Sequence, residues 1–121
     1  MAKVTGLGGI FFKSRDPAAL AAWYAKHLGL DAEAWGGVRF DEDEQRPGYT
    51  LWSPFAADTS YFSAGPQSYM INFRVDDLDA LLAQLRADGV QVDERVDESE
   101  FGRFGWITDP EGTRIELWQP P

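Results

Sequence analysis

An internal repeat constrains this chain more than any other feature of its sequence. Twice, an apolar run leads into an aspartate, a helical pattern and a glycine, and the aspartates Asp16 and Asp77 are 61 residues apart. The glycines Gly29 and Gly89 are 60 residues apart, so the landmarks keep register. Aspartate is a preferred N-cap and glycine a preferred C-cap, so one helix is expected to begin at Asp16 and a second at Asp76 or Asp77. The sheet of one copy would leave an apolar face that the other copy can cover. The repeat therefore predicts one domain built of two similar modules.

Each module is expected to contain a strand, a helix and three further strands. Apolar residues fall on one face of each helical pattern: Leu20, Trp23, Tyr24 and Leu28 in the first, and Leu78, Leu81, Leu82 and Leu85 in the second. Strands are expected near 7–13, 32–35, 37–40 and 50–54, and again near 69–75, 91–93, 104–108 and 116–120. This organisation makes residues 1–55 module one, 56–68 a linker and 69–121 module two of a single α+β domain.

Composition excludes several classes of function. The net charge of −9 and the absence of a basic stripe argue against a nucleic-acid partner. No apolar run is long enough to span a membrane, and residues 1–6 lack the apolar stretch of a secretory signal, so a cytoplasmic protein is expected. The chain has no cysteine and hence no thiolate nucleophile or ligand. The acidic surface is typical of a soluble protein, and attraction of a cationic ligand is the alternative interpretation.

Three segments carry a resemblance to a known family. They are residues 12–24, the helix entry at 72–81, and the turn and terminal strand from Asp109 to Trp118. With the repeat, they resemble the vicinal oxygen chelate superfamily, which includes glyoxalase I, bleomycin-binding proteins and extradiol dioxygenases. The resemblance covers nearly the whole chain and implies two tandem βαβββ modules that form a cupped mixed sheet, commonly in a homodimer. It does not fix the reaction, because the superfamily includes lyases, oxygenases, transferases and binding proteins without catalytic activity.

The family's metal site is expected to be missing. Its four ligand positions, on the first and last strands of each module, map by the resemblance to Gly9, Thr50, Met70 and Glu116. Only the glutamate is a good ligand for a divalent ion, since glycine has no side chain, methionine is soft and threonine is weak. The single histidine, His27, is expected at a helix end, where the helix dipole favours it. We therefore expect no metal and no other cofactor.

Strand alternation then predicts what the concave side of the sheet, the cup, contains. If the four mapped positions face inward, residues two positions away along each strand also do so. The predicted ligand-binding set is Phe11, Lys13, Thr50, Trp52, Met70, Asn72, Arg74, Arg114 and Trp118, with Glu116 as a candidate general base. Ile10, Phe12, Ile71, Phe73, Val75, Ile115 and Leu117 would face the helices as core. In the alternative, Arg114 pairs with Glu116 while Trp52 and Trp118 fill the cup.

An open cup allows two ligand types and three functions. The cations favour an anionic or carbonyl-bearing ligand, whereas the aromatic residues favour a flat ring or a cation. The first function is binding of a small organic molecule without chemical change. The second is a metal-independent lyase or isomerase in which Glu116 removes a proton next to a carbonyl. The third, a metal-dependent glyoxalase-type lyase, needs ligands that the mapping does not find.

A homodimer is expected for either of the first two functions. Apolar side chains in loop and strand regions, such as Trp35, Tyr49, Phe55, Tyr61 and Phe62, would supply an interface. The linker is long enough for the two modules to pair within one chain or to be exchanged between two chains.

Overall fold

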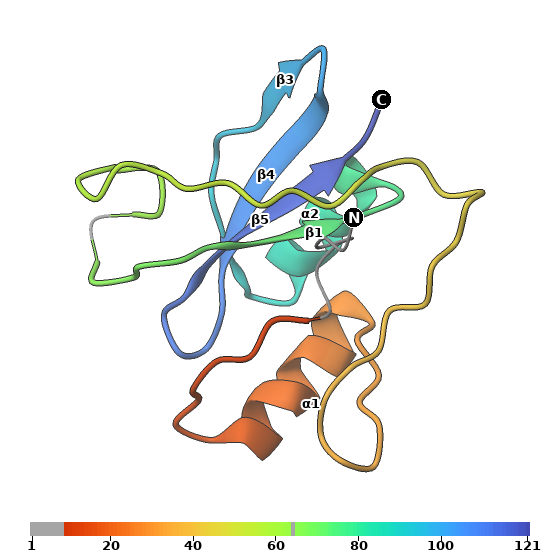
Figure 1. Cartoon of the computed structure of the whole chain (residues 1–121), viewed down its shortest axis with the longest axis vertical. Coiled ribbons are helices and arrows are strands. Elements are labelled where there is room, and N and C mark those ends of the chain that lie inside the picture. Colours follow the sequence, from red (N-terminus) through yellow and green to blue (C-terminus); the bar gives the residue numbers. More distant parts are fainter. Residues whose placement is uncertain (1–8, 64) are drawn as a thin grey trace, which may run out of the picture.

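A computed structural model describes residues 9–63 and 65–121 of the chain. Its elements, in order, are α1 (Pro17–Leu28), β1 (Ile71–Arg74), α2 (Leu78–Ala87), β2 (Gln91–Val92), β3 (Asp97–Ser99), β4 (Gly102–Thr108) and β5 (Arg114–Gln119). Figure 1 shows α2 behind the sheet and an extended segment in front of it. None of the helices in the described residues is long and apolar enough to cross a membrane.

Both helices begin at predicted caps and α1 ends at its predicted glycine, whereas the C-cap of α2 is Asp88 rather than Gly89. The Asp16 carboxylate accepts a hydrogen bond from the backbone N–H of Ala19 at 3.1 Å, and Pro17 occupies the first helical position. Gly29 ends α1 in the left-handed conformation at φ 70°, a region that glycine enters without steric cost. At α2 the Asp77 carboxylate accepts from the N–H of Ala80, also at 3.1 Å. Local sequence therefore determines where both helices begin.

The sheet is mixed, as predicted, and has the order β1-β5-β4-β2, with β3 also paired to β4. β1 and β5 are parallel, whereas β4 is antiparallel to β5, β2 and β3. The turn between β4 and β5 is held by Asp109, whose Oδ1 accepts from the N–H groups of Glu111 and Thr113 at 2.9 Å each. This aspartate stabilises the turn by replacing backbone acceptors.

The core lies between α2 and one face of this sheet. Leu78, Leu82 and Leu85 from α2 pack on Ile107, Ile115 and Leu117 from β4 and β5, and all six are buried. Burying each such side chain stabilises the fold by about 1.5–3 kcal/mol. Phe73 and Val75 are partly buried against this cluster. The predicted alternation of Ile115 and Leu117 toward the helices is therefore confirmed.

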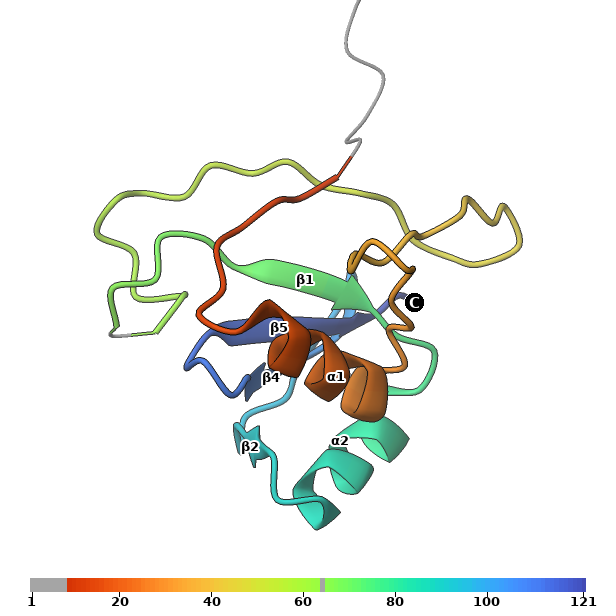
Figure 2. The same ribbon diagram turned by 90° about the horizontal axis from the view of Figure 1, so that it is seen from below.

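Helix α1 joins the core through its aromatic side chains. The Tyr24 hydroxyl donates to Asp109 Oδ2 at 2.9 Å, and its ring lies 6.2 Å from the ring of Phe73. Figure 2 shows both helices on the same side of the β1–β5 layer. The buried turn aspartate therefore connects the helix of the first module to the sheet of the second.

The prediction of four strands in module one was wrong for the described residues. Residues 9–13, 32–35, 37–40 and 50–54 form no ladder there, and residues 7 and 8 lie outside the described part. A turn occupies 33–37, where the N–H of Glu33 donates to the Gly37 carbonyl at 2.8 Å. Ile10 and Phe12, predicted as core, are about half exposed. Alternation signals an extended chain, but a strand also needs a neighbouring edge, and that pairing is a non-local property.

Residues 48–62 instead run across the sheet face opposite the helices, and we refer to them as the crossing segment (Figures 1 and 2). It touches the sheet in several places. A side chain at Gly48 would collide with Arg74 of β1, and the Tyr49 ring lies 5.0 Å from Trp118 of β5. Further along, the Tyr61 ring lies 6.0 Å from Trp106 of β4. The crossing segment therefore covers the face of the sheet that points away from the helices.

Candidate functional site

The face under the crossing segment, which we call the site face, carries two rows of polar and aromatic side chains. Because β1 pairs with β5 and β5 with β4, Asn72 lies beside Glu116 and Glu116 beside Trp106. In the next row Arg74 lies beside Trp118, which lies beside Phe104. Side chains in cross-strand register project from the same face, so each row forms one continuous surface.

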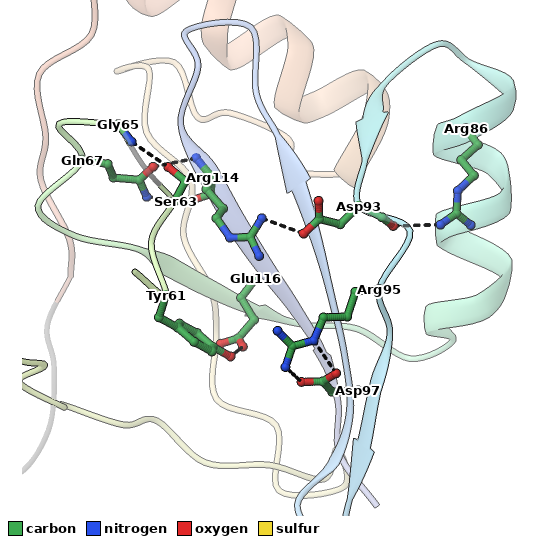
Figure 3. Close-up of polar contacts among 10 residues, drawn as sticks. All are labelled: Tyr61, Ser63, Gly65, Gln67, Arg86, Asp93, Arg95, Asp97, Arg114 and Glu116. Carbon is green, nitrogen blue, oxygen red and sulfur yellow. Dashed lines mark hydrogen bonds and ion pairs between the residues drawn. The ribbon is translucent and has the colours of Figure 1, made fainter. Parts of the chain in front are cut away.

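Glu116 is the centre of the first row. It is only 7% exposed, and both of its carboxylate oxygens have partners. Oε1 accepts a short hydrogen bond from the Tyr61 hydroxyl, and Oε2 accepts from Asn72 Nδ2 at 2.9 Å. Figure 3 shows the Tyr61 hydroxyl meeting the carboxylate. A buried carboxylate without such donors would be costly, and two donors make this one stable as an acceptor.

Tyr61 comes from the linker rather than from a strand. Burial raises the pKa of its phenol above the ordinary value, and the hydrogen bond to Glu116 and the charge of that carboxylate raise the pKa further. The phenol therefore keeps its proton and acts as a donor. Its ring stacks on Phe55 at 5.6 Å and meets the Trp106 ring edge-on at an interplanar angle of 84°.

Trp106 of β4 is the last residue of the first row and contacts the Tyr61 ring. The residue is 1% exposed, and its indole N–H has no hydrogen-bond partner among residues 9–63 and 65–121. The guanidinium groups of Arg95 and Arg114 each lie 5.3 Å from the centre of the indole ring, a cation–π distance. A buried donor without an acceptor costs about 1–3 kcal/mol and is an unused hydrogen-bonding site.

Both arginines form ion pairs with aspartates of the segment 93–97. Arg114 Nη1 donates to Asp93 Oδ2 at 2.7 Å, and Arg95 makes two hydrogen bonds to Asp97, at 2.6 and 2.7 Å (Figure 3). Arg114 therefore pairs with Asp93, not with Glu116 as the filled-cup alternative proposed. The carboxylate of Glu116 is held by neutral donors.

The structure places the sequence-predicted site residues in two groups. Of those in module two, Asn72 and Arg74 of β1 and Arg114, Glu116 and Trp118 of β5 follow the alternation that forms the site face, whereas Met70 precedes β1 and lies in no ladder. Those of module one, Phe11, Lys13, Thr50 and Trp52, are exposed, with Phe11 96% and Trp52 80% exposed. In the described chain Trp52 therefore does not fill the face, whereas Trp118 is buried and stacks on Phe104 at 6.1 Å.

Two residues of the site were missed by the sequence reasoning. Trp106 lies in the predicted strand 104–108, and its signal was available, because alternation from a hairpin turn at 109–112 places it opposite Glu116. Tyr61 lies in the linker, where no periodicity assigns a side chain to a face. Its contact with Glu116 depends on the path of the crossing segment.

The donor set does not fit the metal that the superfamily uses. In the described part of the chain, no three His, Cys, Asp or Glu side chains approach closely enough to hold an ion. Of the mapped positions, Gly9 has no side chain, Thr50 is exposed, and Glu116 already accepts from Tyr61 and Asn72. A divalent ion here would have one strong ligand, below the three protein ligands of a typical catalytic zinc site.

Two hollows lie on the helix side of the described sheet. One of about 390 Å³ is bordered by α1, the end of α2 and the turn after β4, with His27 and Asp88 in its wall. His27 Nδ1 lies 3.6 Å from Asp88 Oδ2. This hollow lies away from Glu116.

Comparison with known proteins agrees with this architecture. The sequence model of the glyoxalase-like domain family matches residues 9–118. The chain belongs to this family. Its mixed sheet and family membership confirm the predicted α+β class with a mixed sheet and the resemblance to the vicinal oxygen chelate superfamily. A search of curated proteins found no match to the chain.

Solved structures of this glyoxalase-like fold align over almost the whole chain. TnmS3, an antibiotic binding protein from Streptomyces sp. CB03234, is 25% identical, with 100% of each chain covered and a TM-score of 0.64. An integron cassette protein from the mobile metagenome of V. cholerae is 19% identical, with 98% of each chain covered and a TM-score of 0.64. A glyoxylase/bleomycin resistance protein/dioxygenase domain from Frankia sp. EAN1pec is 17% identical, covering 98% of this chain and 94% of that one, with a TM-score of 0.61. The last two show the fold alone.

Proposed function

We propose that this glyoxalase-like protein binds a small organic molecule on the site face and releases it unchanged. The observation that carries the proposal is the row of Asn72, Glu116 and Trp106, in which a buried carboxylate and a buried indole adjoin an exposed carboxamide on one surface. A few convergent polar groups among aromatic walls are typical of small-molecule sites. The similarity to TnmS3, an antibiotic binding protein, supports binding rather than turnover.

The ligand is a flat, aromatic molecule with hydrogen-bonding groups. Trp106, Trp118 and Phe104 supply aromatic surface, while Arg95 and Arg114 are already paired with aspartates, which reduces the positive charge that they offer to an anion. Specificity then comes from hydrogen bonds to the buried polar groups of Glu116 and Trp106, because a buried polar group without a partner costs free energy.

Binding without a metal is part of the proposal. The four family ligand positions supply one strong ligand, and two donors already satisfy it. The same two hydrogen bonds disfavour Glu116 as a general base, since a base needs a free lone pair aimed at the substrate proton.

A thermal-shift screen followed by calorimetry tests this function. Flat aromatics, carboxylates, carbonyl compounds and divalent metal salts are added to the purified chain, and the Tm is measured. Binding to the native state at 100 times the Kd stabilises it by about 2.7 kcal/mol. Glu116→Gln should weaken the response to the best organic compound, while Glu98→Gln, on the exposed edge strand β3, is the matched control.

Recovery of the compound distinguishes binding from catalysis. Mass spectrometry of the ligand after prolonged incubation should show it unchanged. Turnover that Glu116→Gln abolishes would favour the lyase or isomerase hypothesis instead, and stabilisation by one metal alone would restore the metalloenzyme hypothesis.

We also propose that the chain forms a homodimer. Large apolar side chains are exposed along module one and its end, including Phe11, Trp35, Phe40, Leu51 and Trp52. Clusters of this kind on a small soluble domain mark an interaction surface. We take the partner for this surface to be a second copy of the same chain, because the modules of the two chains are expected to pair.

A further inference from the structure

The crossing segment places a phenol of the chain itself on the only strongly buried glutamate of the described sheet, and this contact points to the ligand. We propose that Tyr61 is an internal substitute for the ligand, and that the natural ligand carries a hydroxyl on an aromatic ring that replaces the Tyr61 phenol on Glu116. This inference rests on the proposed binding function and names the class of ligand for it.

The surroundings of the Tyr61 ring are those that a bound aromatic ring would need. Its hydroxyl donates to Glu116 Oε1, one face stacks on Phe55, and the Trp106 ring meets it edge-on. Asn72 Nδ2 donates to the other carboxylate oxygen, Oε2, at 2.9 Å, and so helps to hold Oε1 toward the phenol. A hydroxylated ring in this position would find the same contacts.

A ligand phenol can make one contact that Tyr61 does not complete. The buried Trp106 N–H has no hydrogen-bond partner in the described chain, and the Trp106 ring lies 6.0 Å from the Tyr61 ring. A ligand hydroxyl can donate to Glu116 and accept from Trp106 at once, because a phenol oxygen is both donor and acceptor. Satisfying that indole would favour the ligand over the tyrosine.

The segment that carries Tyr61 is suited to release. Residues 56–63 form no strand or helix, and their backbone hydrogen bonds are local turns, from Thr59 N–H to the Ala56 carbonyl and from Ser63 N–H to the Ser60 carbonyl. Segments held by local bonds open at low cost compared with core strands. Tyr61 can therefore leave Glu116 without disturbing β1, β4 or β5.

Calorimetry with a matched pair of probes tests the exchange. The probes are 2-naphthol and its methyl ether, 2-methoxynaphthalene, which keeps the ring and loses the donor. Tyr61→Phe removes the competing hydroxyl, so it should raise the affinity for 2-naphthol about tenfold or more, as expected for a hydrogen bond to a charged group. The affinity for the ether should not change.

Tyr24→Phe is the control variant. Tyr24 also donates to a buried carboxylate, Asp109, but on the helix side of the sheet. Its loss should leave the affinity for both probes as in the wild type, which separates exchange at Glu116 from general destabilisation. In the wild type, the NMR signal of the labelled Tyr61 ring should shift with 2-naphthol and stay fixed with the ether. This NMR comparison tests the exchange in the wild type if the Tyr61→Phe variant does not fold.

Several results would overturn the inference. They are weaker binding of 2-naphthol by Tyr61→Phe, an equal change for both probes, and no binding of 2-naphthol by any variant. The proposed function would survive all three if the thermal-shift screen finds another ligand whose affinity depends on Glu116. It would fail separately if no compound in that screen binds.

Discussion

Two tyrosines donate to buried carboxylates in this protein, and their surroundings give them different roles. Asp109 also accepts two backbone N–H groups of its own turn, so the Tyr24–Asp109 pair belongs to the architecture. Within the described residues, Glu116 accepts hydrogen bonds from side chains alone, those of Tyr61 and Asn72. Because side chains exchange partners more easily than a turn does, the same chemical pair is structural on one face and available for binding on the other.

Both tyrosines should make the fold sensitive to alkali. Burial and the adjacent carboxylate raise the pKa of Tyr24, and burial and Glu116 raise that of Tyr61, above the ordinary value of about 10. Above that pH the unfolded chain loses these protons while the folded chain keeps them, so the free energy of unfolding falls as the pH rises. The upper limit is about 1.4 kcal/mol per pH unit for each tyrosine, and solvent that reaches the rings lowers it.

Urea unfolding between pH 8 and 11 measures this dependence. Tyr24→Phe and Tyr61→Phe should each flatten the decrease above pH 10, and Tyr49→Phe, at an exposed ring, is the control for losing a phenol. An unchanged slope in both test variants would contradict the argument.

Glu111 should make the free energy of unfolding fall at low pH, the opposite end of the range from the tyrosines. The Ser14 hydroxyl donates to its carboxylate at 2.6 Å and the Arg15 N–H at 2.9 Å, and these hydrogen bonds lower the pKa of Glu111. A lowered pKa contributes stability that is present above the ordinary value of about 4.3 and is lost as the pH falls through the folded value. Glu111→Gln should therefore flatten the acid limb of the stability curve, and Glu98→Gln should not. NMR titration of Ser14→Ala should show the pKa of Glu111 moving back up.

At the scale of elements, what could be predicted was what neighbouring residues decide. The caps Asp16 and Asp77 and the apolar face of α2 are local signals, and the structure confirms them. Strands need partners, and segments 9–13 and 50–54 have the composition of strands without forming ladders in the described chain. The same distinction applies to the site. Alternation along β5 places Glu116 and Trp118, whereas Tyr61 reaches the site through a linker path that no pattern encodes.

The energetic centre of these elements is the contact between α2 and β4–β5. Leu85 is fully buried in it, and Leu85→Ala should lower the free energy of unfolding by about 2–5 kcal/mol, through lost burial and a residual cavity. Gln84→Ala, one position along on the exposed face of α2, should change it by less than about 0.5 kcal/mol. Denaturant unfolding at neutral pH measures both. A similar small effect for Leu85→Ala would show that α2 is not packed on the sheet as described.

At the scale of the whole molecule, the two modules contribute unequally. Module two supplies the described sheet and the row of Asn72, Glu116 and Trp106, and module one supplies α1, in which Tyr24 donates to Asp109. Several apolar side chains in the rest of module one are exposed to solvent, Phe11 by 96% and Trp52 by 80%. A net charge of −9 opposes association of such surfaces unless the contact is specific and apolar.

The proposed homodimer follows from this imbalance and can be measured directly. Analytical ultracentrifugation over a range of concentrations should show a dimer that dissociates on dilution. Trp52→Ser should raise the dissociation constant by about tenfold or more, because burying one large apolar side chain is worth about 1.5–3 kcal/mol and 1.4 kcal/mol is a factor of ten. Glu98→Gln, which removes one negative charge without adding apolar surface, is the control. A monomer at all concentrations would contradict the proposal. A dimer that Trp52→Ser leaves unchanged would show that the interface does not include Trp52.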